Sequence, residues 1–458
     1  MLSQTVVNRL KEIVGEKNVV TDKVGLLTYG YDGTLLSGEA LGVVSPHTTE
    51  EVVEIVKLMN EHNIKLVPRG AGTNESGGTI PTQDSVVISF TKMTKIHEID
   101  TENFVAVVEP GVINFDLQVE LEKRNCYFPP DPSSYKASTI GGNVGECSGG
   151  PKCFKYGVTR DYILGLEVVL PNGKVIQTGG RNFQSEPAYD LTRIIVGAEG
   201  TLGLVTKVFV RIIPLPRAKK TMLAIYDKVE DASQTVADIV AAGIIPTTLE
   251  LMDNLLINTT EDFSHAGLPR DAGAVLIIEV DGYPEDMDPQ VKTISEICNK
   301  IAKEFKIAQS AAEVDQIWTS RRCAFGSVAR VRPSYGVNDI TVPRSNFPKA
   351  IEGVIKVTKD YGVTIGVVAH AGDGNLHPLV LFDQRNKEEV ETVHAAEKAL
   401  CMMALDLDGT VSGEHGIGLV KKKYLDSEFT PAAMEAFRKI KRSFDPSNRF
   451  NPGKVFEL

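Results

Sequence analysis

The sequence predicts an α+β protein whose first part alternates strands and helices and whose second part is a separate α+β domain. Apolar runs of strand length alternate with segments of helical periodicity along most of the chain. Pro214-Leu215-Pro216-Arg217 interrupts this alternation and marks a boundary. The length of 458 residues corresponds to two or three domains, each with its own core.

The first part begins with an amphipathic helix pattern over residues 1–18. Residues 41–44 and 65–68 are apolar and of strand length. Between them, Thr48-Thr49-Glu50-Glu51 is a capping-box sequence that starts a helix, so a β-α-β unit is expected. Further strands are expected at 85–90, 103–109, 162–170, 174–177 and 204–213, and a helix around 114–125.

The second part again alternates strands and helices. Val363 to Ala369 and Leu376 to Phe382 are β-rich runs on either side of Asp373-Gly374-Asn375, a hairpin-turn signal. A tail over 411–458 carries a helix near 430–443. The other expected segments of the second part are 221–226, 229–242, 246–251, 274–280, 288–306, 337–343, 347–360 and 386–408.

Charge and composition exclude several classes of partner. The net charge is −11 and the pI is near 5.4, with no dense Lys/Arg tract, so nucleic acid and anionic membrane surfaces are poor partners. No apolar run approaches the ~20 residues of a membrane span. Residues 1–18 lack the apolar core of a signal peptide. The six cysteines include no Cys-x-x-Cys pair, which argues against an iron–sulfur cluster. A cytoplasmic protein is therefore expected.

Three histidines stand among glycines in two short segments. His370 and His377 flank the hairpin turn, and Gly413-Glu414-His415-Gly416 follows later. Imidazole and carboxylate bind zinc or iron, so His370, His377 and Glu414 are candidate ligands of a metal with open positions. His415 would stand beside that site and move a proton. A single histidine of this kind is more often structural, but the joint pattern favours a site.

Three glycine-rich loops are expected in the first part, at 69–78, 139–150 and 197–203. Glycine lets a backbone approach a ligand closely, and rows of backbone N–H groups bind anions. The first loop matches neither the Rossmann pattern nor a P-loop. One such loop would be an ordinary surface loop, but three suggest a long ligand, and a dinucleotide fits.

These loops, with Gly165 to Gly173, resemble the FAD-binding half of the vanillyl-alcohol-oxidase/p-cresol-methylhydroxylase superfamily. The two histidine segments and Asn451-Pro452-Gly453-Lys454 resemble its glycolate oxidase/D-lactate dehydrogenase branch. The resemblance implies an FAD-binding domain of two α/β subdomains over 1–214. It also implies an α+β cap domain with an antiparallel sheet over 215–410, and a C-terminal segment over 411–458 that returns to the flavin site.

The resemblance also implies roles for individual residues. His370, His377 and Glu414 would bind one divalent metal (Fe, Zn or Mn), and His415 would be the catalytic base. Arg321, three residues after Trp318, would bind the substrate carboxylate, with Arg322 as the alternative. FAD would be held by Arg69, Gly70, Ala71, Gly72, Thr73, Asn74, Gly77, Gly78, Pro130, Ser133, Gly141, Gly142, Asn143, Gly145, Gly200 and Asn451. No histidine lies between His62 and His97, so FAD should be non-covalent.

The implied activity is oxidation of a small D-2-hydroxy acid to the 2-oxo acid. Val337 and Leu379 stand where relatives that act on dicarboxylates have polar groups, which favours a monocarboxylate such as D-lactate. Electrons would pass to electron-transfer flavoprotein subunits in an electron-bifurcating complex. The alternative is a glycolate oxidase subunit that reduces a quinone or an iron–sulfur partner. A homo-oligomer is left open.

Two other classes of function explain less of the sequence. A metal-dependent hydrolase or lyase without a redox step would leave the glycine-rich loops unexplained. A flavin module that only relays electrons would leave the histidine segments unexplained.

Overall fold

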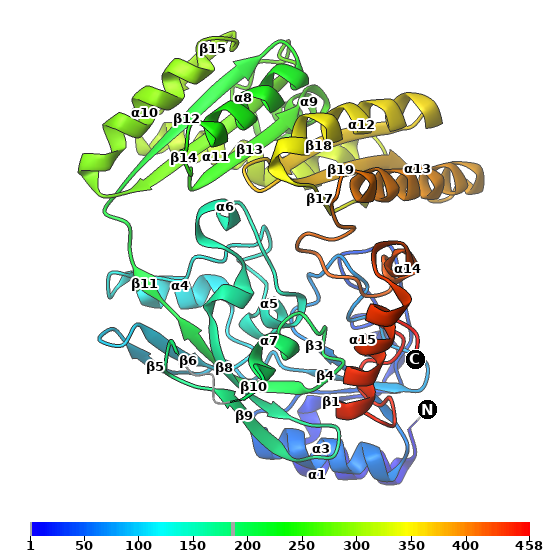
Figure 1. Cartoon of the computed structure of the whole chain (residues 1–458). Helices are drawn as coiled ribbons and strands as arrows, with labels where there is room; N and C mark the ends of the chain where they lie inside the picture. The colour runs from blue at the N-terminus through cyan, green and yellow to red at the C-terminus, as the bar shows by residue number, and fades with distance from the viewer. Residues whose placement is uncertain (1, 185–187) are drawn as a thin grey trace. The chain divides into compact units, whose positions relative to one another are not determined.

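The computed structural model describes residues 2–184 and 188–458 (Figure 1). They form two compact units. The first unit comprises the chain up to Gly149, Gly157–Leu215 and Glu414–Leu458, and the second comprises Gly150–Tyr156 and Pro216–Gly413. The segment Gly150–Tyr156 therefore belongs with the second unit although it lies within the first in sequence. The expected three-part scheme stays a proposal.

The first unit contains two main sheets. One has the order β1-β2-β4-β3, with β2, β4 and β3 parallel and β1 antiparallel to β2. The other has the antiparallel order β5-β6-β10-β8-β9. The strands are β1 Val19–Val20, β2 Gly42–Val44, β3 Lys65–Arg69, β4 Ser85–Ser89, β5 Ile96–Asp100, β6 Val105–Val108, β7 Cys126–Tyr127, β8 Ile163–Val169, β9 Val175–Gly179, β10 Leu204–Arg211 and β11 Ile213–Pro214.

Helices cover the parallel sheet because their apolar faces pack on it. Thr48 caps α3 by accepting a hydrogen bond from the backbone N–H of Glu51, as its sequence predicts. Buried residues of α1 and α3 join those of β2 and β4 in one hydrophobic core, which also takes in Phe450 from the tail. The helices of this unit are α1 Gln4–Val14, α2 Lys23–Leu27, α3 Thr49–Glu61, α4 Asn114–Glu122, α5 Ile140–Glu146, α7 Leu191–Ile195, α14 Leu425–Glu428 and α15 Pro431–Phe444.

The second unit is built on one antiparallel sheet of eight strands. The order is β15-β12-β14-β13-β18-β19-β16, and β17 also pairs with β19. The predicted hairpin is confirmed as β18 and β19. The strands are β12 Ala218–Tyr226, β13 Thr248–Asp253, β14 Ala274–Gly282, β15 Glu304–Ile307, β16 Ser334–Val337, β17 Ile340–Thr341, β18 Thr364–His370 and β19 Asn375–Phe382.

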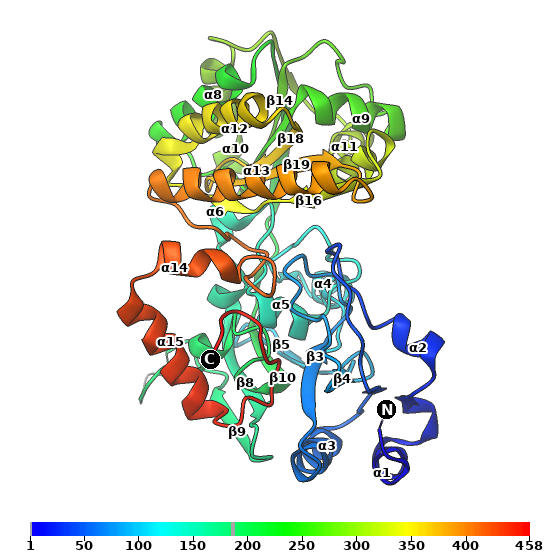
Figure 2. The same cartoon turned by 90° about the vertical axis from the view of Figure 1, so that its right-hand side faces the viewer.

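The two faces of this sheet carry different helices. On one face α10 contacts α8, α8 contacts α12 and α12 contacts α13 (Figure 1), and α9 and α11 pack together on the other (Figure 2). Met252, Val368, Leu379 and Ala324 belong to the core beneath α9 and α11. The helices are α6 Cys153–Tyr156, α8 Val229–Ala241, α9 Asn254–Ser264, α10 Pro284–Cys298, α11 Ala311–Ser327, α12 Phe347–Tyr361 and α13 Lys387–Asp406.

The structure corrects one expected loop. Residues 139–150 were expected as a glycine-rich loop, but Ile140–Glu146 form helix α5. The side chain of Thr139 caps this helix by accepting from the N–H of Gly142, which offsets the poor helix propensity of its three glycines. The prediction of a loop was therefore wrong here, while 69–78, apart from Arg69 at the end of β3, and 197–203 lie outside helices and strands as expected.

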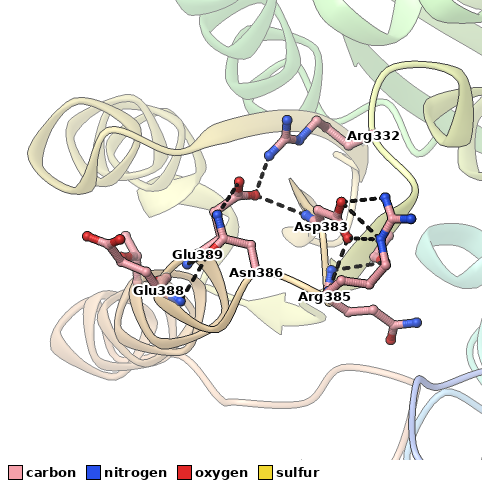
Figure 3. A network of polar contacts seen from close by, with 9 residues as sticks. Arg332, Asp383, Arg385, Asn386, Glu388 and Glu389 are labelled. Carbon is pink, nitrogen blue, oxygen red and sulfur yellow. Dashed lines mark hydrogen bonds and ion pairs between the residues drawn. The ribbon is translucent and has the colours of Figure 1, made fainter.

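A network of polar side chains lies in the second unit between the end of β19 and the start of α13. Asn386 caps α13, and the carboxylate of Glu389 accepts from the backbone N–H of Asp383 at 3.0 Å and pairs with Arg332 (Figure 3). Asp383 also pairs with Arg385. Among the described residues, no helix is long and apolar enough to cross a membrane.

Candidate functional site

The hairpin places two buried imidazoles side by side. His370 ends β18 opposite Asn375, and His377 lies opposite Val368. The two rings are edge to face, with centroids 5.0 Å apart. Both side chains lie on the face covered by α9 and α11, since Val368 and Leu379 of the same strands pack there. The hairpin turn predicted from Asp373-Gly374-Asn375 thus sets their separation.

Glu250 joins this pair, although no sequence motif pointed to it. It lies on β13 directly opposite His370 and is fully buried. One carboxylate oxygen, Oε1, is 2.7 Å from Nδ1 of His370. The other, Oε2, accepts a hydrogen bond of 2.6 Å from Nε of Arg321. The only available signal was an acidic residue in an apolar strand, Thr248–Asp253.

The pKa of Glu250 is lowered despite its burial. Burial by itself raises the pKa, but the charges of His370 and Arg321 and their hydrogen bonds together outweigh it. The carboxylate is therefore ionised and acts as a hydrogen-bond acceptor for both neighbours.

Arg321 presents a free donor to the same site. Its side chain is buried on α11 and lies over the ring of Phe325, 5.9 Å from the centroid. Because Glu250 takes Nε, the Nη2 nitrogen has no hydrogen-bond partner among the described residues. Arg322 is instead exposed and pairs with Asp315 at 3.5 Å. Of the two adjacent arginines, only Arg321 lies beside the imidazoles.

The carboxylate of Asp339 links the hairpin to Ser412 and Gly413, the last residues of the second unit. It accepts from Nδ2 of Asn375 at 3.0 Å and from the backbone N–H of Gly413 at 3.0 Å. Ser412 donates its hydroxyl to the same carboxylate at 2.8 Å. Gly413 is peptide-bonded to Glu414, so the second unit ends one residue before the candidate carboxylate ligand.

In the first unit, His415 lies beside a residue of the first glycine-rich loop. Its Nδ1 is 3.2 Å from Oε2 of Glu75, and its Nε2 is 3.9 Å from Glu414. The chain after His415 is anchored by Glu199, which accepts from the N–H groups of Ile417 at 2.7 Å and Gly418 at 2.8 Å.

A second buried carboxyl, Glu146 of α5, faces the same segment. A Cβ placed on Gly416 would lie 2.2 Å from Oε2 of Glu146, and Gly416 has φ +85°, so only glycine fits. Burial first, and then the charge of Glu199, hold the pKa of Glu146 well above its usual range. Burial also raises the pKa of Glu199, although the N–H groups of Ile417 and Gly418 oppose it.

The first glycine-rich loop presents its backbone donors. None of the N–H groups of residues 70–74 donates to another described residue. Arg69 is buried and donates to the carbonyl of Tyr31 at 2.7 Å, and Asn74 donates to Asp32 at 2.8 Å. Gly72 has φ +73°, and a Cβ there would meet the Arg69 guanidinium. This is the geometry of an anion-binding loop.

Other predicted cofactor residues lie in α5, in the segment before it, in the loop 197–203 and in the tail. Asn143 has a buried side-chain nitrogen without a described partner, and a Cβ on Gly145 would meet nothing within 4 Å. The side chain of Asn451 links the tail to the glycine-rich loops 69–78 and 197–203. Its Nδ2 donates to the carbonyl of Gly78 at 2.8 Å and to that of Glu199 at 2.7 Å. Pro130 is buried and Ser133 is exposed. Gly200 has φ +67° and packs on Pro68.

Family models match both parts of the chain. Residues 40–179 match the FAD binding domain model, and residues 215–455 match the C-terminal domain model of FAD linked oxidases. The chain belongs to the FAD-linked oxidases. It is an FAD-binding oxidoreductase of the glycolate oxidase/D-lactate dehydrogenase type, which confirms the family expected from the motifs.

Two relatives span this FAD-linked oxidase almost completely. It is 43% identical over 458 residues to the glycolate oxidase subunit GlcD of Bacillus subtilis (strain 168), covering 100% of this chain and 97% of the relative. It is 31% identical over 460 residues to the D-lactate dehydrogenase of Anaerostipes hadrus, covering 98% and 96%. The solved structure of p-cresol methylhydroxylase matches with a TM-score of 0.82 and 19% identity, covering 100% of this chain and 98% of that one. That match shows a shared fold.

The residues of this oxidase fit FAD in the first unit. The donors of residues 70–74 suit a pyrophosphate, and the open space beside Gly145 with the unpartnered amide of Asn143 suits a flat polar ring. FAD, when bound, supplies the electron-accepting flavin.

Proposed function

We propose that this FAD-linked oxidase oxidises a small D-2-hydroxy acid, with D-lactate favoured, to the corresponding 2-oxo acid. The observation that carries this proposal is the buried Arg321, whose Nη2 donor has no described partner and whose guanidinium shares Glu250 with His370. A buried cation with an unused donor needs an anion, and the planar guanidinium matches a carboxylate.

An apolar pair on the sheet face that carries His377 favours a monocarboxylate. Val337 and Leu379 are cross-strand partners on β16 and β19, and Leu379 is fully buried in the core beneath α9 and α11. An apolar pair at this position offers no partner to a second carboxylate, whose burial there would be costly. A substrate with a methyl group or hydrogen beside its hydroxyl carbon fits better.

His370, His377 and Glu414 would hold a divalent metal. Glu250 lies beside Nδ1 of His370, so Nε2 would be the ligand atom. Such a metal would lower the pKa of the substrate hydroxyl. His415 is adjacent in sequence and would accept the hydroxyl proton, with Glu75 near its Nδ1 to orient the ring.

We also propose that FAD is held without a covalent bond, since the first glycine-rich loop contains no histidine. Hydride from the substrate carbon would go to flavin N5, and the electrons would then pass to electron-transfer flavoprotein subunits. The second candidate is a glycolate oxidase subunit serving a quinone or an iron–sulfur partner, which the name of the 43% identical relative favours.

Two variants test the assigned roles against each other. His377→Ala removes a proposed ligand, so metal content and D-lactate oxidation should fall together. His415→Asn removes a proposed base, so metal and FAD contents should stay normal while turnover falls about 10²–10⁴-fold. Full metal content in His377→Ala, or near-normal turnover in His415→Asn, would show that the role is assigned to the wrong residue.

A further inference from the structure

We infer that Glu250 is a positioning residue that fixes the metal ligand His370 and the substrate-binding Arg321 at the same time. This inference rests on the proposed function. Glu250 sits between the two, with one oxygen 2.7 Å from Nδ1 of His370 and the other 2.6 Å from Nε of Arg321. Their distance in sequence is large, but β13, β18 and α11 bring all three side chains to one face of the sheet.

The first consequence concerns the tautomer of His370. Oε2 of Glu250 accepts from Arg321 and Oε1 lies 2.7 Å from Nδ1 of His370, so the arrangement is that of a carboxylate between two donors, with the ring proton on Nδ1. The lone pair of a neutral imidazole then stands on Nε2, so Nε2 is the ring atom that can bind a cation. Both side chains are buried, so water does not compete for Nδ1.

The second consequence concerns the orientation of Arg321. A carboxylate facing the end of the guanidinium would occupy both Nη atoms in a bidentate pair. Glu250 instead binds Nε, and Nη2 remains without a partner among the described residues. The ring of Phe325 beneath the guanidinium supports the same orientation. Glu250 therefore holds the arginine while leaving its outer edge for a substrate carboxylate.

A neighbouring carboxylate provides a matched control. Glu279 lies on β14, is also buried, and accepts from Nε1 of Trp318 at 3.2 Å and from Thr221 at 2.7 Å. Trp318 is one helical turn before Arg321 on α11. Glu279 and Glu250 thus both fasten α11 to the sheet, but only Glu250 contacts His370 and Arg321. Replacing either carboxylate disturbs the helix, while replacing Glu250 alone should disturb the site.

The test compares Glu250→Gln with Glu279→Gln in the FAD-loaded protein. Glutamine keeps the size of the side chain but has one acceptor oxygen and one donor group. If its oxygen accepts from Arg321, its amide N–H faces Nδ1 of His370, and Nδ1 can accept that hydrogen bond only when the ring proton has moved to Nε2. The measurements are the affinity for Zn²⁺ by competition with a chelator, the Kd and maximal rate of flavin reduction by D-lactate, and the thermal midpoint.

We expect Glu250→Gln to lower Zn²⁺ affinity about 10–100-fold and to weaken D-lactate binding at least several-fold. Glu279→Gln should lower the thermal midpoint comparably and leave Zn²⁺ affinity unchanged. Glu250→Asp, which keeps both acceptors on a shorter side chain, should show smaller losses and serves if Glu250→Gln does not fold. Unchanged Zn²⁺ affinity in both Glu250 variants, or an equal loss in Glu279→Gln, would overturn the inference.

A measurement without turnover separates this inference from the proposed function. Nitrogen-15 NMR of histidine-labelled, metal-free protein, with His370 assigned from a His370→Gln variant, should show the Nδ1-protonated tautomer in wild type and a mixed population in Glu250→Gln. If D-lactate does not reduce the wild-type flavin, the proposed substrate is wrong, while this spectrum still decides the role of Glu250. An Nε2-protonated His370 in wild type would refute that role.

Discussion

Arg321 and Arg322 are adjacent in sequence but differ in environment, which makes a direct comparison possible. Lysine keeps the charge but lacks the planar donor set of arginine. Arg321→Lys should raise KM for D-lactate at least 10-fold with FAD content unchanged, because the fork toward the carboxylate and the bond to Glu250 are both lost. Arg322→Lys should behave like wild type, since Arg322 has only an exposed pair with Asp315. The opposite result in steady-state kinetics would move the role to Arg322.

Among the individual residues of the candidate site, the sequence identified His370 and His377 but not Glu250. His370 and His377 are recognisable because a hairpin turn separates them, so their proximity is a local property. Glu250 is 120 positions from His370, and their contact depends on the pairing of β13 with β18. No local pattern encodes that pairing. The role of Arg321 came from family resemblance, and its burial beside Glu250 became visible only in the fold.

Among the elements, α5 shows how capping overrides composition. Three glycines in seven residues favour a loop, and a loop was expected. The cap by Thr139 and the burial of Ile140 and Val144 stabilise the helix instead. The longer strands and the hairpin were predictable because their apolar runs have strand length, but the short strands β5 and β15 were not expected. Helices α9 and α11 were not, and α11 has few buried residues for its length.

Helix α5 also carries Glu146, whose raised pKa predicts a dependence of stability on pH. The ordinary pKa is 4.5, and the folded value lies well above it. Between these two values the folded state holds a proton that the unfolded state has released. Stability therefore falls as pH rises through this range, by up to about 1.4 kcal/mol per pH unit, and is not reduced below it.

Glu146→Gln should remove this loss. Denaturant unfolding at pH 4.5 and pH 8 should show a smaller decrease in the variant than in wild type. Glu39→Gln, an exposed change in the same unit, serves as the control and should follow wild type. If wild type and Glu146→Gln lose the same stability over this range, Glu146 is already ionised in the folded protein.

For the whole molecule, the order of motifs identified the family before any fold was known. The glycine-rich loops, the histidine segments and the tail motif follow one another along the 458 residues in the order expected for the family. The family models match the corresponding ranges. The sequence did not indicate that Gly150–Tyr156 belongs to the second unit, because this depends on contacts distant in sequence, such as the ion pair of Lys155 with Asp281. The identity of the electron acceptor was not predictable from the residues of this chain alone.

Cofactor attachment gives a prediction for the whole protein. Denaturation with acid should release all FAD into the supernatant, because the first glycine-rich loop contains no histidine to bind it covalently. The absorbance of the supernatant measures released FAD, and the washed pellet should be colourless. Flavin that stays with the washed, denatured chain would contradict non-covalent binding.

The most direct test of the central claim is an anaerobic titration of the purified, metal-loaded protein with D-lactate, followed by flavin absorbance. The account predicts that D-lactate bleaches the flavin in proportion to the substrate added and yields pyruvate, while L-lactate and a dicarboxylic hydroxy acid such as D-malate leave it oxidised. Glycolate reducing the flavin more efficiently than D-lactate would favour the second candidate. A flavin that no 2-hydroxy acid reduces would contradict the account.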